Sequence, residues 1–270
     1  MLIQDKVSWD GDVDKKLARL ATLGVDCVAL ELPDPPLASA GMNLSTPDSA
    51  IDFFKGAKAK VDAHGLELRT VLATSGLYEI KKGTAGRDSK IAMLLNALQG
   101  MGAAGIPIMA YNFKLLNSKE LRSVPTQGRG DAKYISFDYD AYLKNPARPV
   151  EPAISEAQMW DNITYFLTAM IPASEKVSTF DNYRRIFGIA QSRSNGMLFC
   201  QGCVTEMKGV DVYEAIREIG SIDKIVMVHF RNVRGEFPRF QEVFVDNGDV
   251  DMYRAMQAYC DVGFKGPLSL

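Results

Sequence analysis

Apolar residues recur along the chain in two alternating patterns: short runs typical of buried strands, and stripes at helical spacing. The clearest helix is predicted to start after Thr46, a threonine N-cap followed by Pro47, and to end at Gly65. An apolar run typical of a strand, Leu66–Ala73, follows at once. The same alternation continues through most of the chain, so the pattern predicts repeated strand–helix units.

The predicted strands are Met1–Val7, Asp26–Leu32, Leu66–Ala73, Ile106–Phe113, Asn195–Gln201, Ile225–Phe230 and Gly266–Leu270. The predicted helices are Asp12–Leu23, the helix capped by Thr46, Arg87–Met101, a helix from the Ser155/Gln158 capping box to Met170, Thr179–Ala190, Asp211–Ile219, and Asp249–Tyr259 capped by Asp249. Repeated units of this kind predict an α/β fold with a parallel sheet and helices outside it. Eight such units would close a TIM barrel.

The alternation breaks once, between Met170 and the predicted helix Thr179–Ala190. About eight residues cannot hold two connecting loops and a buried strand. A strand is therefore predicted to be missing near residues 171–178. Residues 114–151 form the only long predicted loop, which we interpret as a lid over a binding site or as a plain surface excursion.

The composition indicates an ordinary soluble globular protein, with 270 residues, 47% hydrophobic residues and a net charge of −2. Charges of both signs are interspersed, which argues against nucleic-acid and membrane-surface partners. Apolar runs are far shorter than the ~18 residues that span a bilayer, and no apolar segment of a signal peptide follows Met1. The 4 cysteines predict free thiols in a reducing cytoplasm.

Cys200 and His229 each end a predicted strand, and a single helix separates the two strands. Consecutive parallel strands are usually adjacent, so both side chains are expected at the same carboxyl rim, where such folds keep their active sites. A thiolate with an imidazole suits a divalent transition metal such as Zn²⁺, Mn²⁺ or Fe²⁺. The alternatives are a small buried hydrophobe at Cys200 and a structural histidine at His229. Cys203 completes a C-x-x-C spacing, but no helix N-terminus of a redox motif is evident there, so Cys203 is expected to be structural.

Polar residues at two strand ends are candidate ligands of a small acid. Arg231 and Asn232 follow His229, and a guanidinium binds a carboxylate bidentately. Tyr111 and Asn112 end another strand and are predicted to reach the same cavity. The alternatives are a solvated pair at Arg231 and Asn232, and core packing of Tyr111.

No other motif assigns the chemistry. Glu206 and Glu242 are possible carboxylate ligands or bases, although charged loop residues are usually just solvated. His64 precedes Gly65 at a helix end, where an imidazolium favours the helix dipole. Neither a Gly-rich phosphate loop nor a serine nucleophile elbow occurs. The general base is therefore unassigned.

Several segments together carry a family resemblance. The segments LFCQGC (Leu198–Cys203), VHFRNVRG (Val228–Gly235), FQEVFVDNGDVDM (Phe240–Met252) and GFKGPL (Gly263–Leu268) closely resemble mannonate dehydratase of the hexuronate-catabolism type. The segments AGIPIMAYNF (Ala104–Phe113), VALELPD (Val28–Asp34) and GRDSKI (Gly86–Ile91) are similar too, so the resemblance covers essentially the whole chain.

The resemblance implies a single xylose-isomerase-like TIM-barrel domain over residues 1–270. It implies dehydration of D-mannonate to 2-keto-3-deoxy-D-gluconate with Mn²⁺ or Fe²⁺, in glucuronate catabolism. Cys200 and His229 fall on two of the family's metal ligands. A cytoplasmic homo-oligomer whose partner is a small sugar acid, not a nucleic acid or a membrane, is expected.

The chain also departs from the family pattern. The family carries a histidine ligand on its fifth strand, in a His-Pro-Asp-Asp type motif, and this is where a strand is predicted to be missing. The family's Asp-His pair and a later tyrosine fall beyond Leu270, so the catalytic residues are unassigned and the barrel is expected to be incomplete. Two alternatives stay open: a related metal-dependent sugar isomerase or epimerase of the same barrel class, and a catalytically inactive homologue that binds a sugar acid.

Overall fold

The computed structural model describes residues 1–36, 40–74, 77–115, 126–146, 153–170, 187–188 and 196–270. The chain forms two compact units. The N-terminal unit comprises Leu2–Phe113 with Ile154–Met197. The C-terminal unit comprises Lys114–Ala153 with Leu198–Leu270, together with Met1.

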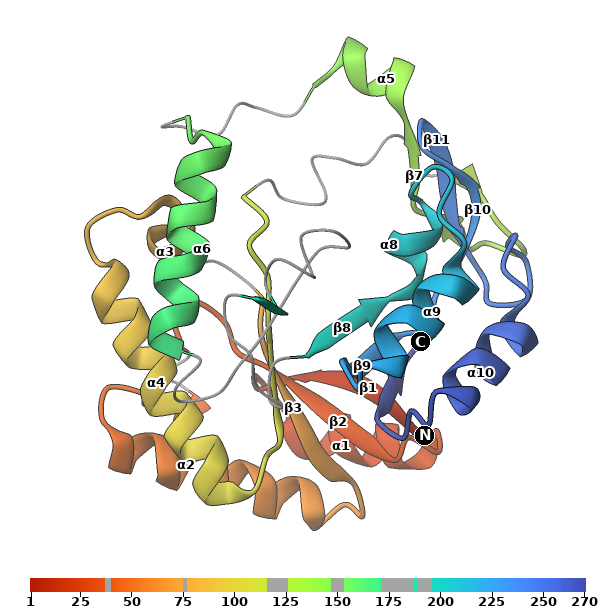
Figure 1. Ribbon diagram of the computed structural model, residues 1–270. Coiled ribbons are helices and arrows are strands. Elements are labelled where there is room, and N and C mark those ends of the chain that lie inside the picture. Colours follow the sequence, from red (N-terminus) through yellow and green to blue (C-terminus); the bar gives the residue numbers. More distant parts are fainter. Residues whose placement is uncertain (37–39, 75–76, 116–125, 147–152, 171–186, 189–195) are drawn as a thin grey trace. The chain divides into compact units, whose positions relative to one another are not determined.

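Four parallel strands form the sheet of the N-terminal unit and pair in chain order (Figure 1). They are β1 (Leu2–Ser8), β2 (Cys27–Glu31), β3 (Glu67–Ala73) and β4 (Ile108–Tyr111). The register places Leu30 beside Val7 on one side and beside Val71 on the other. All four strands lie within or close to the predicted ranges, which confirms the strand pattern of this half of the chain.

The helices of this unit are α1 (Val13–Thr22), α2 (Pro47–Asp62), α3 (Tyr78–Lys82), α4 (Arg87–Ala104) and α6 (Glu156–Met170). Two predicted caps are confirmed. The Thr46 hydroxyl accepts a hydrogen bond from the Ser49 amide at 3.2 Å, and Ser155 and Gln158 exchange side-chain hydrogen bonds with each other's amides. Helix α3 was not predicted, because five residues are too few to show helical periodicity.

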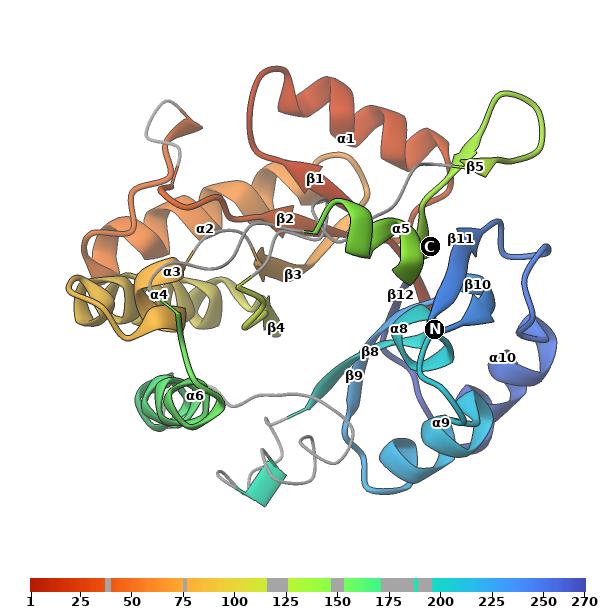
Figure 2. The same ribbon diagram turned by 90° about the horizontal axis from the view of Figure 1, so that it is seen from above.

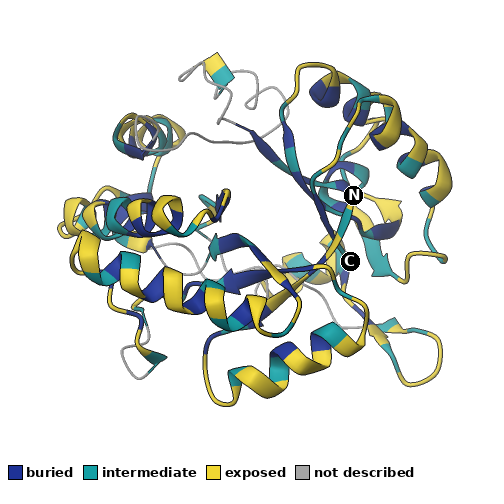
Figure 3. Ribbon diagram, turned by 90° about the horizontal axis from the view of Figure 1, so that it is seen from below, coloured by how far each residue is buried: buried dark blue, intermediate teal, exposed yellow. Residues whose placement is uncertain are grey.

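Helices α2 and α4 pack closely against each other, and Figure 3 shows α2 with one buried and one exposed face. Gly100 lies at their contact. A Cβ built there would come within 2.5 Å of the Ala50 carbonyl oxygen. Any side chain at this position would force the helices apart, so the glycine sets how closely they approach.

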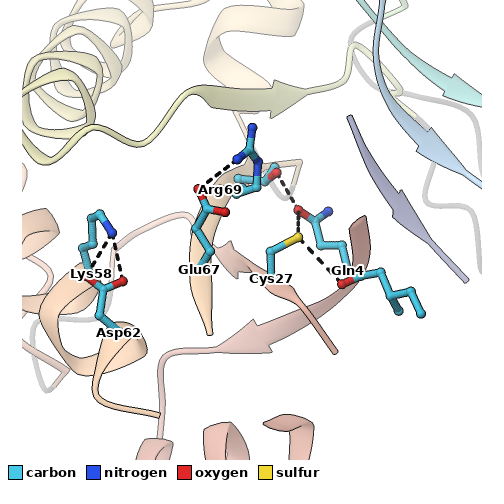
Figure 4. A network of polar contacts seen from close by, with 8 residues as sticks. Gln4, Cys27, Lys58, Asp62, Glu67 and Arg69 are labelled. Atoms are coloured by element: carbon cyan, nitrogen blue, oxygen red, sulfur yellow. Dashed lines mark hydrogen bonds and ion pairs between the residues drawn. The ribbon is translucent and has the colours of Figure 1, made fainter. Parts of the chain in front are cut away.

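A small polar network is buried across the first three strands (Figure 4). The Thr70 hydroxyl donates to Gln4 Oε1 at 2.8 Å, and both residues are buried. The Cys27 thiol, between them on β2, donates to the Ile3 carbonyl at 3.7 Å. Burial raises the pKa of this thiol to about 12, so Cys27 stays protonated and unreactive near neutral pH.

The C-terminal unit contains three parallel strands in the order β12-β9-β8: β8 (Met197–Cys200), β9 (Ile225–His229) and β12 (Pro267–Ser269). With the four strands of the other unit, these account for all seven predicted strands. The helices are α8 (Gln201–Thr205), α9 (Val212–Ser221) and α10 (Met252–Asp261), and α9 packs beside α10 (Figure 2).

The predicted start of α10 is corrected by two residues. Asp251, and not Asp249, is its N-cap and accepts from the amides of Tyr253 and Arg254, both at 3.0 Å. Asp249 instead accepts a hydrogen bond from the Gly235 amide at 2.6 Å. A tertiary contact with the preceding hairpin therefore decides which of two nearby aspartates caps the helix.

The segment after His229 is a β-hairpin. Strands β10 (Asn232–Glu236) and β11 (Arg239–Val243) pair antiparallel, and β11 also pairs with β7 (Ser136–Asp138). The described part of the predicted loop 114–151 thus contributes a strand to this small sheet. It also holds β5 (Thr126–Gln127), β6 (Lys133–Tyr134) and α5 (Tyr139–Lys144).

The predicted missing strand near residues 171–178 lies outside the described residues, as does nearly all of the predicted helix Thr179–Ala190. Among the helices that the structure describes, none is long and apolar enough to cross a bilayer.

Candidate functional site

Cys200 and His229 are the last residues of two neighbouring parallel strands, β8 and β9, as the sequence predicts. Both side chains are half-buried. The Cys200 sulfur is hydrogen-bonded to Cys203 and to His229. These hydrogen bonds, together with the positive charge of Arg231, hold the pKa of the Cys200 thiol well below its usual range and outweigh the opposing effect of burial. These contacts therefore favour the thiolate form of Cys200, which is the form that binds metals.

Arg231 connects the sulfur atoms to two carboxylates. Its Nη2 donates to Cys200 Sγ at 3.0 Å and to Cys203 Sγ at 3.3 Å. Its Nη1 forms an ion pair with Glu242, and its Nη2 lies 3.8 Å from Glu206 Oε1. Burial alone lowers the pKa of the guanidinium, but the Cys200 thiolate and Glu242 outweigh it, so the pKa of Arg231 is raised and the side chain is always charged.

Gly202 makes room for this guanidinium. A Cβ at position 202 would lie 3.0 Å from both Cζ and Nη2 of Arg231. Gly202 lies in α8 between the two cysteines. Because glycine has no side chain, the guanidinium can lie against this residue and reach both sulfurs.

A buried pair holds the backbone of Arg231 in place. Gln201 Nε2 donates to the Arg231 carbonyl at 3.0 Å, and the Tyr259 hydroxyl donates to Gln201 Oε1 at 3.2 Å. Gln201 and Tyr259 are both fully buried. The sequence pattern did not indicate this pair. The one local feature that could have pointed to it is a glutamine, Gln201, that directly follows the apolar strand β8.

Two residues with carboxylate side chains, Glu206 and Glu242, and the second cysteine, Cys203, also belong to the cluster around Arg231. Glu206 and Glu242 form ion pairs with Arg231 and are not simply solvated. Cys203 follows Cys200 within a helix, because Cys200 is the N-cap residue of α8. The expectation that no helix begins at the C-x-x-C segment is therefore wrong, although α8 has only five residues.

Asn232 is buried and its amide is fully engaged with the backbone. Its Nδ2 donates to the carbonyls of Val245 and Val250 at 2.7 and 3.0 Å, and its Oδ1 accepts from the Val250 amide at 3.1 Å. The asparagine thus fixes the connection between β11 and α10. This structural role differs from the carboxylate contact that the sequence suggested.

Tyr111 and Asn112 belong to the N-terminal unit. The Tyr111 ring packs against Phe166 with 5.0 Å between ring centroids. Asn112 Nδ2 donates to the Thr74 carbonyl at 2.8 Å, and its Oδ1 accepts from Nζ of the buried Lys81 at 3.3 Å. The structure therefore gives Tyr111 the packing role that was the alternative for it.

Within the described part of the chain, no group of three or more His, Cys, Asp or Glu side chains is arranged to hold a metal ion. Cys200 and His229 fit a divalent transition metal by their donor chemistry, as a thiolate beside an imidazole. They supply two ligands, fewer than the three protein ligands of a typical catalytic zinc site.

Comparison with known proteins supports the resemblance read from the sequence. Residues 176–270 match the family model described as D-mannonate dehydratase (UxuA). A curated relative, mannonate dehydratase 2 of Halalkalibacterium halodurans, is 26% identical over 258 residues, which cover 78% of this chain and 75% of the relative. Mannonate dehydratase of Oceanobacillus iheyensis is 24% identical over 267 residues, covering 80% and 75%.

Solved structures show the fold. Mannonate dehydratase from Streptococcus suis serotype 2 matches 99% of this chain and 84% of its own, with a TM-score of 0.80 and 20% identity. A xylose isomerase domain protein from Planctomyces limnophilus matches 99% and 89%, with a TM-score of 0.62 and 15% identity. The predicted xylose-isomerase-like TIM-barrel class is thereby confirmed, and the relatives found are mannonate dehydratases.

Proposed function

We propose that this chain is a hydro-lyase that dehydrates D-mannonate to 2-keto-3-deoxy-D-gluconate. The observation that carries the proposal is the pairing of Cys200 and His229 at the carboxyl ends of neighbouring strands, in a chain whose relatives are mannonate dehydratases. Carboxyl ends of parallel strands are where α/β enzymes place their reacting groups.

We propose Mn²⁺ or Fe²⁺ as the cofactor, with Cys200 and His229 as two of its ligands. Support comes from the donor set and from the contacts that keep Cys200 a thiolate. When bound, a divalent ion offsets the negative charge that develops as a proton leaves the carbon next to a carboxylate.

The role we propose for Arg231 is to hold Cys200 and to attract the carboxylate of the sugar acid. Its Nη2 already donates hydrogen bonds to the two sulfurs, and these bonds hold the Cys200 side chain in place at the end of β8. Its Nη1 is paired with Glu242. A substrate carboxylate that reaches the guanidinium therefore competes with Glu242 for Nη1.

A second candidate is isomerisation or epimerisation of a sugar or sugar acid. The observation that favours it is the fold shared with the xylose isomerase domain protein. The third is binding of a sugar acid without turnover. This function is favoured because the described residues bring together two candidate metal ligands, Cys200 and His229, whereas a typical catalytic zinc site has three protein ligands.

Mass spectrometry of the products separates these three functions. The purified chain is incubated with D-mannonate and Mn²⁺, beside Cys200→Ser and His229→Ala variants as controls. Dehydration yields a product lighter than the substrate by one water, and only from the unaltered chain. A product of unchanged mass but altered structure would support isomerisation. Substrate protection against thermal unfolding with no product would support the inactive homologue.

We also propose that the protein works in the cytoplasm as a homo-oligomer. All four cysteines are free thiols, which fits a reducing compartment. Light scattering of the purified chain measures the oligomeric state, and a monomeric mass at micromolar concentration would contradict the second part.

A further inference from the structure

We propose that Cys200 and Cys203 form a reversible intramolecular disulfide when the protein meets a low-molecular-weight disulfide, so that this pair is a modification site. The consequence for the metal rests on the proposed function, in which Cys200 is a ligand. The formation of the disulfide itself does not.

The two sulfurs are close neighbours. One nitrogen atom, Nη2 of Arg231, contacts both, at 3.0 Å from Cys200 Sγ and 3.3 Å from Cys203 Sγ. The two side chains are also hydrogen-bonded to each other. Rotation of the two side chains toward each other would bring the sulfurs to the ~2.05 Å of a disulfide.

The backbone also suits the bond. Cys200 is the N-cap of α8 and Cys203 lies three residues further along. Residues three apart on a helical turn have Cα atoms about 5–6 Å apart, within the range of natural disulfides.

The cysteines differ in how far a reagent can reach them. Cys200 and Cys203 are half-buried, whereas Cys27 is buried and Cys260, on α10, is exposed. Cys260 has no second cysteine within its own helix, because α10 contains only one. The geometry therefore favours the pair at α8 over the other two.

The reaction is a pair of thiol–disulfide exchanges. The Cys200 sulfur attacks one sulfur of oxidised glutathione, which forms a mixed disulfide and releases one glutathione thiolate. The Cys203 thiol then loses its proton to solvent, and its sulfur attacks the Cys200 sulfur, releasing the second glutathione. Starting from the Cys200 thiolate, the protein loses two electrons and one proton, and oxidised glutathione is reduced to two glutathione thiolates, which take up protons from solvent.

Disulfide formation would also change the site. A sulfur in a disulfide is no longer the thiolate that binds a metal, so Cys200 serves either as a ligand or as half of the bond. Arg231 would lose its contact with a thiolate and keep its ion pair with Glu242. On the proposed function, oxidation therefore removes one metal ligand and reduction restores it.

The test treats the full, reduced, metal-free chain with oxidised glutathione, blocks remaining thiols with an alkylating reagent, and digests it with trypsin. One tryptic peptide, residues 194–208, contains both cysteines. We expect this peptide to escape alkylation and to be lighter than its dithiol form by two hydrogens, and we expect dithiothreitol to restore both thiols. Cys260→Ser should behave in the same way, whereas Cys203→Ser should stop at a glutathione adduct on Cys200.

An unmodified peptide, or a glutathione adduct on Cys200 that persists in the unaltered chain, would overturn the proposal. Mn²⁺ titration of the reduced and oxidised forms separates this outcome from a failure of the proposed function. A disulfide that forms without changing Mn²⁺ binding would leave the modification site standing and remove Cys200 from the ligands. Absence of the disulfide, with Mn²⁺ binding lost in Cys200→Ser, would do the reverse.

Discussion

Arg231 Nη2 lies 3.0 Å from Cys200 Sγ, so a guanidinium that follows strand β9 holds the thiolate that ends strand β8. The contact joins residues 31 positions apart in the sequence. It places a positive charge and an anionic sulfur in a half-buried setting, where their attraction is stronger than in water. The first two predictions below follow from this relationship.

Replacing Arg231 with methionine should raise the pKa of the Cys200 thiol. The charge of Arg231 is one of the causes that lower this pKa, so its removal shifts the titration upward and leaves less thiolate at neutral pH. The rate of Cys200 alkylation, followed by peptide mass spectrometry from pH 5 to 9, measures the shift. Arg217→Met on the exposed face of α9 is the matched control. An identical pH profile in both variants would show that Arg231 does not stabilise the thiolate.

Gly202→Ala should displace the guanidinium without unfolding the protein. The new Cβ would lie 3.0 Å from Arg231 Cζ, so the arginine must move away from the sulfurs. We expect slower alkylation of Cys200 at neutral pH and an unchanged far-ultraviolet circular dichroism spectrum. Gly102→Ala is the control, because a Cβ at that helical position meets nothing within 4 Å. Normal alkylation of the Gly202→Ala variant would mean that the guanidinium tolerates the methyl group.

Gly100→Ala should destabilise the fold, whereas Gly102→Ala should not. At position 100 the methyl group would lie 2.5 Å from the Ala50 carbonyl oxygen and force α4 away from α2. Overpacking of this kind costs about 1–3 kcal/mol of unfolding free energy. At position 102 the substitution should be neutral or stabilise by up to about 1 kcal/mol. Urea unfolding of both variants measures the difference, and equal midpoints would contradict the predicted helix contact.

Gln201→Leu should cost more stability than Tyr259→Phe. Removing the tyrosine hydroxyl deletes one hydrogen bond, worth about 1 kcal/mol. Removing the glutamine amide leaves both the Arg231 carbonyl and the Tyr259 hydroxyl buried without this partner, at about 1–3 kcal/mol each. The double variant should be less destabilised than the sum of the two single variants, because the hydroxyl no longer needs a partner. Strict additivity in chemical denaturation would show that the two side chains act independently.

The parallel strands were predictable because each buried strand is a short apolar run with a clear end. The same reasoning placed Cys200 and His229 at one edge, since consecutive strands of such a fold are neighbours. The hairpin after His229 was not predictable, because its strands carry mostly polar side chains, including Arg234 and Gln241, and show little burial. Strand β11 also pairs with β7, which lies about 100 residues earlier in the chain.

Contacts between distant residues were also beyond sequence reasoning. The Tyr259–Gln201 hydrogen bond spans 58 positions, and no local pattern marks either residue as a partner of the other. The capping role of Asp251 was misassigned to Asp249, because both aspartates precede the same apolar stripe. The hydrogen bonds of the folded chain distinguish them: Asp251 accepts from the amides of Tyr253 and Arg254, and Asp249 from the amide of Gly235.

Titration with Co²⁺ tests the central claim, that Cys200 and His229 are ligands of one metal ion, most directly. Cobalt replaces other divalent metals at sites of this chemistry, and a thiolate ligand gives it a sulfur-to-metal charge-transfer absorption in the near ultraviolet. We predict this absorption for the reduced chain and for Cys203→Ser and His64→Ala, its loss in Cys200→Ser, and weaker binding in His229→Ala. Absorption that persists in Cys200→Ser, or that disappears only in Cys203→Ser, would contradict the assignment of Cys200 as the metal-binding thiolate.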